Sequence, residues 1–318
     1  MKGSAPPALI LITGPTGSGK TDLVHVLAEK MPAPIISADS MQVYRHMDIG
    51  TAKPNREERS KYAYRLIDLV NPDEPFNAAI FQDYAAAALE ETGKKGHLAY
   101  VAGGTGLYIK VLLGGLIAGP GPDEALRSQH REWAEKYGRS CLHALLRKRD
   151  PAAADRLNPN DLVRVSRALE VLELTGQSIT GIQKGHAFQR TDSFRYVKIG
   201  VMMERQRLQQ RIEARVERMW EAGLEDEVKQ LLRNNYGPEL KSMQSLGYRH
   251  VVGYLQGCWS KDQAMTLMKR DTWQYAKRQM TWFKKDAEII WFEPDDIKGI
   301  RSRIDCFREG LMRAGENP

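Results

Sequence analysis

The sequence has little cysteine and no long apolar segment. Its three cysteines, Cys141, Cys258 and Cys306, lie far apart and form neither a C-x-x-C zinc pair nor an even disulfide set. No uncharged apolar stretch reaches the ~18 residues that a membrane-spanning helix needs. The first apolar run, residues 9–12, is too short for the apolar region of a signal peptide. We therefore expect a cytoplasmic protein without a membrane segment.

Acidic residues are outnumbered in only one part of the chain. The formal net charge is +7, from 47 Lys and Arg against 40 Asp and Glu. Residues 1–119 contain equal numbers of basic and acidic side chains, so the whole excess falls in residues 120–318. A polyanionic partner such as nucleic acid explains this bias. A soluble enzyme that is merely basic is the alternative.

A phosphate-binding loop, the P-loop, follows the first apolar run. Residues 14–21 read G-x-x-x-x-G-K-[ST], and a helical pattern follows over residues 22–30. Glycines let backbone N–H groups surround an anion, and the helix N-terminus adds its dipole. Lys20 can reach terminal phosphate oxygens, and the Thr21 hydroxyl can bind Mg²⁺. The predicted phosphate-binding residues are Gly14, Pro15, Thr16, Gly17, Ser18, Gly19, Lys20 and Thr21.

Short apolar runs alternate with helical patterns in the first half of the chain. This β-α-β rhythm predicts an α/β fold, a P-loop NTPase-like parallel sheet with flanking helices. Asp39 and the turn at residues 103–106 follow predicted strands, so we expect both at the sheet edge that carries the P-loop. The predicted strands are Leu9–Thr13, Ile35–Ala38, Leu66–Val70, Leu98–Ala102, Val197–Met202 and Ile289–Phe292.

The pattern changes to a helical insertion at a Gly-Pro-Gly-Pro break over residues 119–122. We predict a discontinuous core domain, residues 1–119 and 194–318, and a helical insertion domain, residues 120–193. After the insertion, one long helix is predicted over 205–234 and another over 261–285. The latter interleaves basic and aromatic side chains, which suits nucleic acid. An amphipathic helix with a solvated basic face is the alternative.

Four further strings carry a resemblance to a known family. They are Ser37–Tyr44 (SADSMQVY), Met47–Pro54 (MDIGTAKP), Val101–Tyr108 (VAGGTGLY) and Gly247–Arg249 (GYR). Together with the P-loop, they resemble the tRNA dimethylallyltransferase family, also called tRNA isopentenyltransferase. The likeness runs from about residue 8 to residue 292. The chain after it has one cysteine and therefore lacks the zinc finger of some eukaryotic relatives, so it resembles the bacterial form.

The resemblance implies a reaction and its catalytic groups. That family transfers a dimethylallyl group from dimethylallyl diphosphate to N6 of adenosine 37 in tRNA, uses Mg²⁺ and releases diphosphate. The P-loop would then hold an allylic diphosphate rather than ATP, with Lys20 and Arg211 on the leaving group. Asp39 matches the carboxylate that accepts the N6 proton, and Thr105 matches a threonine near both substrates. From position alone, Asp39 also fits an aspartate that touches Mg²⁺ through water, and Thr105 fits an ordinary turn residue.

The resemblance also implies contacts to the anticodon stem-loop of tRNA. For each arginine taken alone, a solvated surface charge is the other explanation. The residues implied are Asp39, Ser40, Met41, Gln42, Thr105, Arg127, Val163, Arg164, Val165, Ser166, Arg167, Gln244, Ser245, Leu246, Gly247, Tyr248 and Arg249.

Three other functions compete with this prediction. One is a P-loop kinase of a small molecule, with residues 120–193 as a lid. Another is an adenylate isopentenyltransferase that uses free AMP. The third is a GTPase-like RNA-binding switch, which the absence of an N-K-x-D guanine motif disfavours. The charge bias and the insertion favour an RNA acceptor, and we expect no obligatory protein partner.

Overall fold

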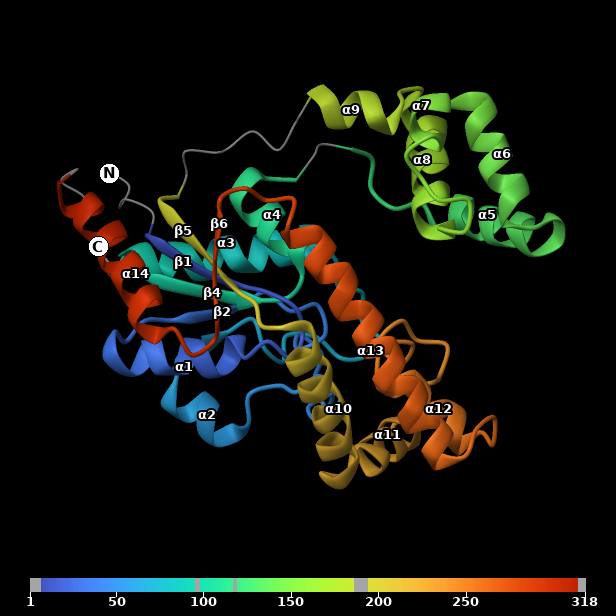
Figure 1. Cartoon of the computed structure of the whole chain (residues 1–318). Coiled ribbons are helices and arrows are strands. Elements are labelled where there is room, and N and C mark those ends of the chain that lie inside the picture. Colours follow the sequence, from blue (N-terminus) through green and yellow to red (C-terminus); the bar gives the residue numbers. More distant parts are fainter. Residues whose placement is uncertain (1–6, 95–97, 117–118, 186–193, 314–318) are drawn as a thin grey trace. The chain divides into compact units, whose positions relative to one another are not determined.

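A six-stranded parallel sheet forms the centre of the larger part of the molecule (Figure 1). The structure, a computed structural model, describes residues 7–94, 98–116, 119–185 and 194–313. The strand order is β3-β2-β4-β1-β5-β6, and every adjacent pair is parallel. The predicted α/β parallel sheet is confirmed. The strands are β1 (Leu9–Thr13), β2 (Ile35–Ser37), β3 (Tyr64–Arg65), β4 (Ala99–Gly103), β5 (Tyr196–Val201) and β6 (Ile289–Phe292).

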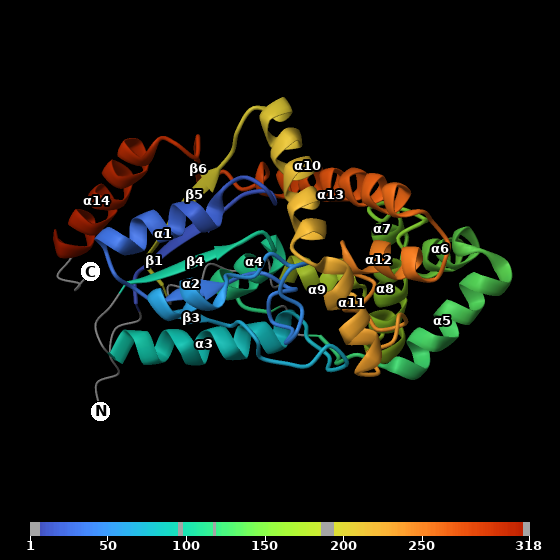
Figure 2. The same ribbon diagram turned by 90° about the horizontal axis from the view of Figure 1, so that it is seen from below.

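Helices cover both faces of this sheet (Figure 2). Strand β1 is buried along its whole length, because alternate residues point to opposite faces and each face has its own apolar cluster. Ile10 and Ile12 belong to the cluster formed with helices α1 and α14. Leu9 and Leu11 belong to the cluster formed with α3 and α4. The helices beside the sheet are α1 (Lys20–Lys30), α2 (Arg56–Lys61), α3 (Ala78–Lys94), α4 (Gly106–Gly114) and α14 (Ile297–Arg313).

Four helices between β5 and β6 lie next to one another beyond the carboxyl end of the sheet (Figure 1). The prediction of one helix over 205–234 is wrong, because the chain breaks at Gly223. That residue adopts a left-handed conformation, φ 96°, and is the N-cap of the second helix. Apolar side chains of both helices pack into the same core. The helical spacing of apolar residues in the sequence therefore shows no interruption at the break. These helices are α10 (Arg205–Glu221), α11 (Leu224–Arg233), α12 (Tyr248–Leu255) and α13 (Lys261–Phe283).

The predicted strand at 66–70 is also wrong. The third strand is β3, and the chain leaves the extended conformation directly after it, with φ of 63° at Leu66 and 54° at Asp68. Only Val70 makes a single bridge, to Tyr44. The carboxylate of Asp68 accepts a hydrogen bond from Lys53, and the apolar run is a partly buried loop in which Leu66 and Val70 face the core.

The helical insertion is a compact unit of its own. The chain divides into Met1–Leu113 with Thr191–Pro318, and Gly114–Arg190. The predicted boundary at residues 193 and 194 lies at the edge of residues 186–193, outside the described part. Leu142, Leu146 and Leu169 belong to the insertion's separate core. Its helices are α5 (Glu124–Tyr137), α6 (Arg139–Arg149), α7 (Pro151–Ala154), α8 (Leu162–Thr175) and α9 (Ile179–Gly185). No helix in the described ranges is long and apolar enough to cross a membrane.

Candidate active site

The P-loop joins the central strand β1 to α1. Gly14 has φ 146°, and a Cβ there would lie 2.4 Å from the carbonyl oxygen of Val201, so the turn requires glycine. Gly19 is the left-handed N-cap of α1. Because glycine has no side chain that could cap the helix, the first N–H groups of α1 remain available to an anion. The Ser18 hydroxyl is buried without a protein partner among the described residues. These features suit a bound phosphate group.

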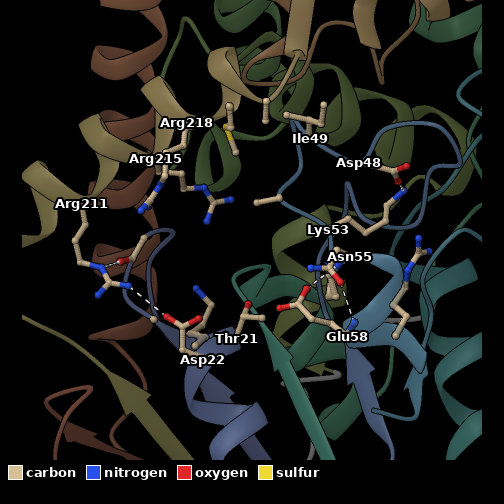
Figure 3. Close-up of a pocket in the computed structure, with 18 of the residues that line it drawn as sticks. Thr21, Asp22, Asp48, Ile49, Lys53, Asn55, Glu58, Arg211, Arg215 and Arg218 are labelled. Carbon is tan, nitrogen blue, oxygen red and sulfur yellow. Dashed lines mark hydrogen bonds and ion pairs between the residues drawn. The ribbon is translucent and has the colours of Figure 1, made fainter. Parts of the chain in front are cut away.

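A large cavity, the P-loop cavity, opens beside this loop (Figure 3). Its volume is about 710 Å³, and it lies between the P-loop, residues 48–59 and helix α10. Three arginines of α10 line it at positions i, i+4 and i+7, so they share one helix face. In Figure 3, Arg215 and Arg218 extend toward the open space, opposite Asp48 and Ile49. The arginines are Arg211, Arg215 and Arg218.

Positive charge dominates this cavity. Arg211 donates to the carbonyl oxygen of Gly17 at 3.0 Å and pairs with Asp22 at 3.4 Å. Among the described residues, no carboxylate forms a salt bridge with Arg215. Burial and, to a lesser degree, the nearby Arg215 lower the pKa of Lys20 to about 7, and Asp39 opposes this shift. A bound polyanion would supply the negative charge that these cations lack.

A second cavity, the Asp39 cavity, lies on the other side of Arg215. Its volume is about 320 Å³, and Arg215 lines both cavities. The structure thus brings the predicted residues after β2 together with those before α12. Helix α13 contributes a further wall, which includes Tyr275. The residues predicted from the sequence that line this cavity are Thr16, Asp39, Ser40, Met41, Gln244, Ser245, Leu246 and Arg249.

Local hydrogen bonds fix the orientation of Asp39 directly after β2. Its Oδ1 accepts from the N–H of Met41 at 2.8 Å and, more weakly, from that of Gln42 at 3.4 Å. The Thr105 hydroxyl accepts from the N–H of Ser40 at 3.1 Å, and the Thr105 N–H donates to Ala38. The expectation that Asp39 and the turn at residues 103–106 share one edge with the P-loop is confirmed. The Asx-type turn points one carboxylate oxygen inward and leaves the other for a ligand.

A small cavity of about 40 Å³ lies between α1 and β2, and Gln42 lines it. Thr21, Ser37 and Asp39 line it as well, so a hydroxyl and a carboxylate are close to the phosphate site. No cluster of three or more His, Cys, Asp or Glu in the described part of the chain could hold a metal by itself. A hard cation here would therefore draw most of its ligands from phosphate and water, as Mg²⁺ commonly does.

The residues of the Gly-Tyr-Arg motif occupy different environments. Tyr248 is fully buried, and its hydroxyl donates to Glu227 at 2.6 Å. Arg249 is 40% exposed and pairs with Asp271 at 2.7 Å. Gly247 is buried. The Oγ atom of Ser245 is also buried, and it has no hydrogen-bond partner among the described residues. Within this motif and its flank, Ser245 and Arg249 line the Asp39 cavity, whereas the buried Tyr248 does not.

The predicted residues of the insertion also differ in availability. Arg127 of α5 and Arg167 of α8 both pair with Glu170 of α8, which is completely buried. Arg127 therefore joins α5 to α8, whereas Arg167 pairs within its own helix. Val165 and Ser166 are buried in the same unit. Arg164 is 67% exposed, and the one ion pair that it forms within the described ranges is with the neighbouring Asp161. Val163 beside it is 80% exposed. Arg164 and Val163 are thus the predicted residues of α8 that face solvent.

Sequence reasoning missed several residues of the site. Arg215 and Arg218 could have been found from their helical spacing with Arg211. Tyr275 could have been found from its place in the basic and aromatic pattern of α13. Burial and the nearby Asp39 raise the pKa of Tyr275 to about 12. Gln279 carried no sequence signal, yet it contacts the P-loop.

Known proteins resemble this chain over nearly its full length. The model of the IPP transferase family matches residues 42–286, and that of the isopentenyl transferase family matches residues 7–68. A tRNA dimethylallyltransferase 2 of Syntrophus aciditrophicus is 50% identical over 96% of this chain and 97% of its own. A tRNA dimethylallyltransferase of Geobacter metallireducens is 47% identical over 96% of this chain and 99% of its own.

The chain belongs to the IPP transferase family. Solved structures of related enzymes agree with this. The full-length tRNA isopentenylpyrophosphate transferase of Bacillus halodurans has a TM-score of 0.71 at 37% identity, with 97% of this chain and 99% of that chain covered. A eukaryotic dimethylallyltransferase acting on tRNA has a TM-score of 0.79 at 26% identity, with 98% of this chain and 80% of that chain covered. The predicted resemblance to a family of tRNA-modifying transferases is confirmed, and so is the P-loop NTPase-like fold class.

Proposed function

We propose that this protein transfers a dimethylallyl group from dimethylallyl diphosphate to N6 of adenosine 37 in tRNA. The observation that carries the proposal is that Arg215 lines both the phosphate-binding cavity and the cavity of Asp39. A donor bound through its diphosphate can therefore present its allylic carbon to a base that enters from the Asp39 side. Family membership supports the same reaction.

The donor is held by the P-loop and the arginines of α10. The loop amides, Lys20, Arg211 and Arg215 stabilise the negative charge that develops on the diphosphate as the C–O bond breaks. The residues at the small cavity fit Mg²⁺, with Thr21 as a ligand and Asp39 in reach directly or through water. Mg²⁺, when bound, would add charge stabilisation at the leaving group.

The acceptor is oriented by Asp39. The exocyclic N6 is a weak nucleophile because its lone pair is delocalised into the adenine ring. The carboxylate of Asp39 accepts a hydrogen bond from N6 and takes its proton as the new C–N bond forms. The electrons of the broken C–O bond leave with diphosphate. The Thr105 hydroxyl, which accepts from Ser40, remains able to donate to a substrate atom.

The RNA is held by basic residues. Adenosine 37 must leave the stacked anticodon loop to reach Asp39, at a cost of a few kcal/mol. Phosphate contacts from the insertion, with Arg164 as the exposed candidate on α8, offset this cost. Ser245, Gln244 and Arg249 line the Asp39 cavity, which supports a role for them in contacts with the base or its neighbours.

A three-way assay separates the candidate functions. The protein is incubated with Mg²⁺ and, in turn, dimethylallyl diphosphate with unmodified tRNA, the same donor with AMP, and ATP with the tRNA alone. We expect prenylated product in the first incubation and none in the second, with no requirement for ATP. Product only with AMP would indicate an adenylate isopentenyltransferase, and ATP consumption without prenyl transfer would indicate a kinase-like or NTPase activity.

A further inference from the structure

Helix α11 contacts a loop that forms part of both cavities. The carboxylate of Glu227 accepts hydrogen bonds from three consecutive backbone N–H groups, those of Asp48 at 2.9 Å, Ile49 at 2.7 Å and Gly50 at 3.1 Å. It also accepts from the hydroxyl of Tyr248 at 2.6 Å. Four donors thus converge on one carboxylate. Hydrogen bonds to an ionised acceptor are the stronger kind, so this contact fixes the loop conformation.

The same loop also packs against Tyr248 and is bonded within its own segment. Gly50 lies against the ring of Tyr248, so closely that a Cβ at residue 50 would be 2.5 Å from Cε2 of the tyrosine. The Thr51 hydroxyl donates to the carbonyl oxygen of Met47. The Lys53 ammonium donates to the carbonyl oxygen of Tyr44 and to the carboxylate of Asp48. The three N–H groups at residues 48–50 donate to Glu227, so its removal would deprive these backbone donors of their charged acceptor.

The same loop forms walls of both cavities. Asp48 and Ile49 line the P-loop cavity on the side opposite Arg215, as Figure 3 shows. Gly50 and Thr51 line the Asp39 cavity. A shift of this loop would change the width of the donor site. Lys20 belongs to helix α1, and Asp39 is held by its own local hydrogen bonds directly after β2, so neither depends on the contact with Glu227.

We infer that Glu227, together with Tyr248, is a positioning residue that sets the shape of the donor site through the backbone of residues 48–50. Glu227 touches neither cavity and acts only through this loop. The inference rests on the proposed function for its kinetic part, since it concerns how the donor is bound. It also gives the buried Tyr248 of the Gly-Tyr-Arg motif a role that needs no direct contact with tRNA.

The test compares Glu227→Gln and Tyr248→Phe with the wild type and with Asp226→Asn as a control. Glutamine preserves size but has one acceptor oxygen, and its NH₂ group would face N–H donors. Phenylalanine keeps the ring against Gly50 and removes only the O–H donor. Asp226 is on the same helix turn, is 85% exposed, and pairs with Lys229 of its own helix.

The first readout is amide hydrogen exchange of residues 48–50 in the free protein. We expect exchange about tenfold or more faster in Glu227→Gln, a factor set by the removal of a charge-assisted acceptor. In Tyr248→Phe the exchange of residues 48–50 should also be faster than in the wild type, by a smaller factor. In Asp226→Asn the exchange should match that of the wild type. Unchanged exchange in both folded variants would overturn the inference.

The second readout is steady-state kinetics with dimethylallyl diphosphate and tRNA. We expect the donor KM of Glu227→Gln to rise by about tenfold while kcat changes less than about threefold, because the reacting groups remain in place. An unchanged donor KM, or a loss of kcat alone, would contradict the positioning role. A wild-type protein that transfers no prenyl group would contradict the proposed function instead, and the exchange measurement would still test the loop.

Discussion

The side-chain oxygen of Gln279 accepts a hydrogen bond from the N–H of Thr16 at 2.8 Å, although 263 residues separate the two in sequence. The amide nitrogen of Gln279 donates to the carbonyl oxygen of Gly104 at 2.9 Å. One buried amide on α13 therefore connects the P-loop with the turn that precedes Thr105. The phosphate-binding loop and the acceptor-side turn are thus held in a fixed relation by a third element.

Removal of this bridge should slow the reaction and destabilise the fold. Gln279→Leu leaves the N–H of Thr16 and the carbonyl oxygen of Gly104 without their hydrogen-bond partner, each at a cost of about 1–3 kcal/mol when buried. We expect kcat/KM to fall by about tenfold to a hundredfold, with a lower midpoint in thermal unfolding. Gln274→Leu, an exposed position on the same helix, is the matched control. Equal behaviour of the two variants would show that the bridge has no role.

Donor binding should take up a proton above neutral pH. Because the pKa of Lys20 is lowered to about 7 in the free protein, much of Lys20 is neutral at pH 8. The diphosphate favours the ammonium form and raises this pKa, so donor affinity should weaken as the pH rises above 7. Calorimetry at pH 8 in buffers of different ionisation enthalpy should detect a net uptake of protons on donor binding.

Two lysine variants test the source of that proton. Lys20→Met should abolish the uptake and also remove a contact to the leaving group, with a loss of ~10²-fold or more in rate. Lys30→Met, at the exposed end of α1, should leave both quantities unchanged. Proton uptake that persists in Lys20→Met would mean that another group titrates.

Asp39→Asn should separate base catalysis from metal binding. The amide keeps the shape of the side chain but cannot take the N6 proton, so turnover should fall by ~10²–10⁴-fold. Donor affinity should remain nearly intact, as measured by equilibrium binding in Mg²⁺. If saturating turnover were unchanged while Mg²⁺ or donor affinity fell, Asp39 would belong to the metal site.

The exposed arginine of α8 should contribute to tRNA affinity through phosphate. Arg164→Ala should weaken tRNA binding and lower the slope of log affinity against log salt by roughly one unit for each phosphate that the arginine neutralises in the wild type. Its surface pair with Asp161 adds little stability, so the fold should be unaffected. Arg147→Ala, an exposed arginine on α6, is the control. Identical salt slopes would make Arg164 an ordinary surface charge.

Arg167 should behave differently from Arg164. Because it pairs with the buried Glu170, Arg167→Ala removes one of the two cations on that carboxylate and should destabilise the insertion. A loss of tRNA affinity in this variant therefore needs a parallel unfolding measurement. A variant with wild-type stability and weakened tRNA binding would show that Arg167 contacts RNA directly.

Local patterns predicted the parts of the site that follow strands. Asp39 and the P-loop could be placed on one edge because parallel strands end at the same edge. The loop at 66–70 could not be predicted, because its positive φ values at Leu66 and Asp68 depend on distant partners such as Lys53. The contacts of Glu227 and Gln279 join segments far apart in sequence, so no local periodicity reports them.

The most direct test of the account is the identity of the modified atom. Unmodified tRNA and a transcript with guanosine in place of adenosine 37 are each incubated with the protein, Mg²⁺ and dimethylallyl diphosphate, without ATP, and their nucleosides are analysed by mass spectrometry. We expect N6-dimethylallyladenosine from the first RNA and no prenylated nucleoside from the second. Prenylation of both RNAs, or of neither, would contradict it.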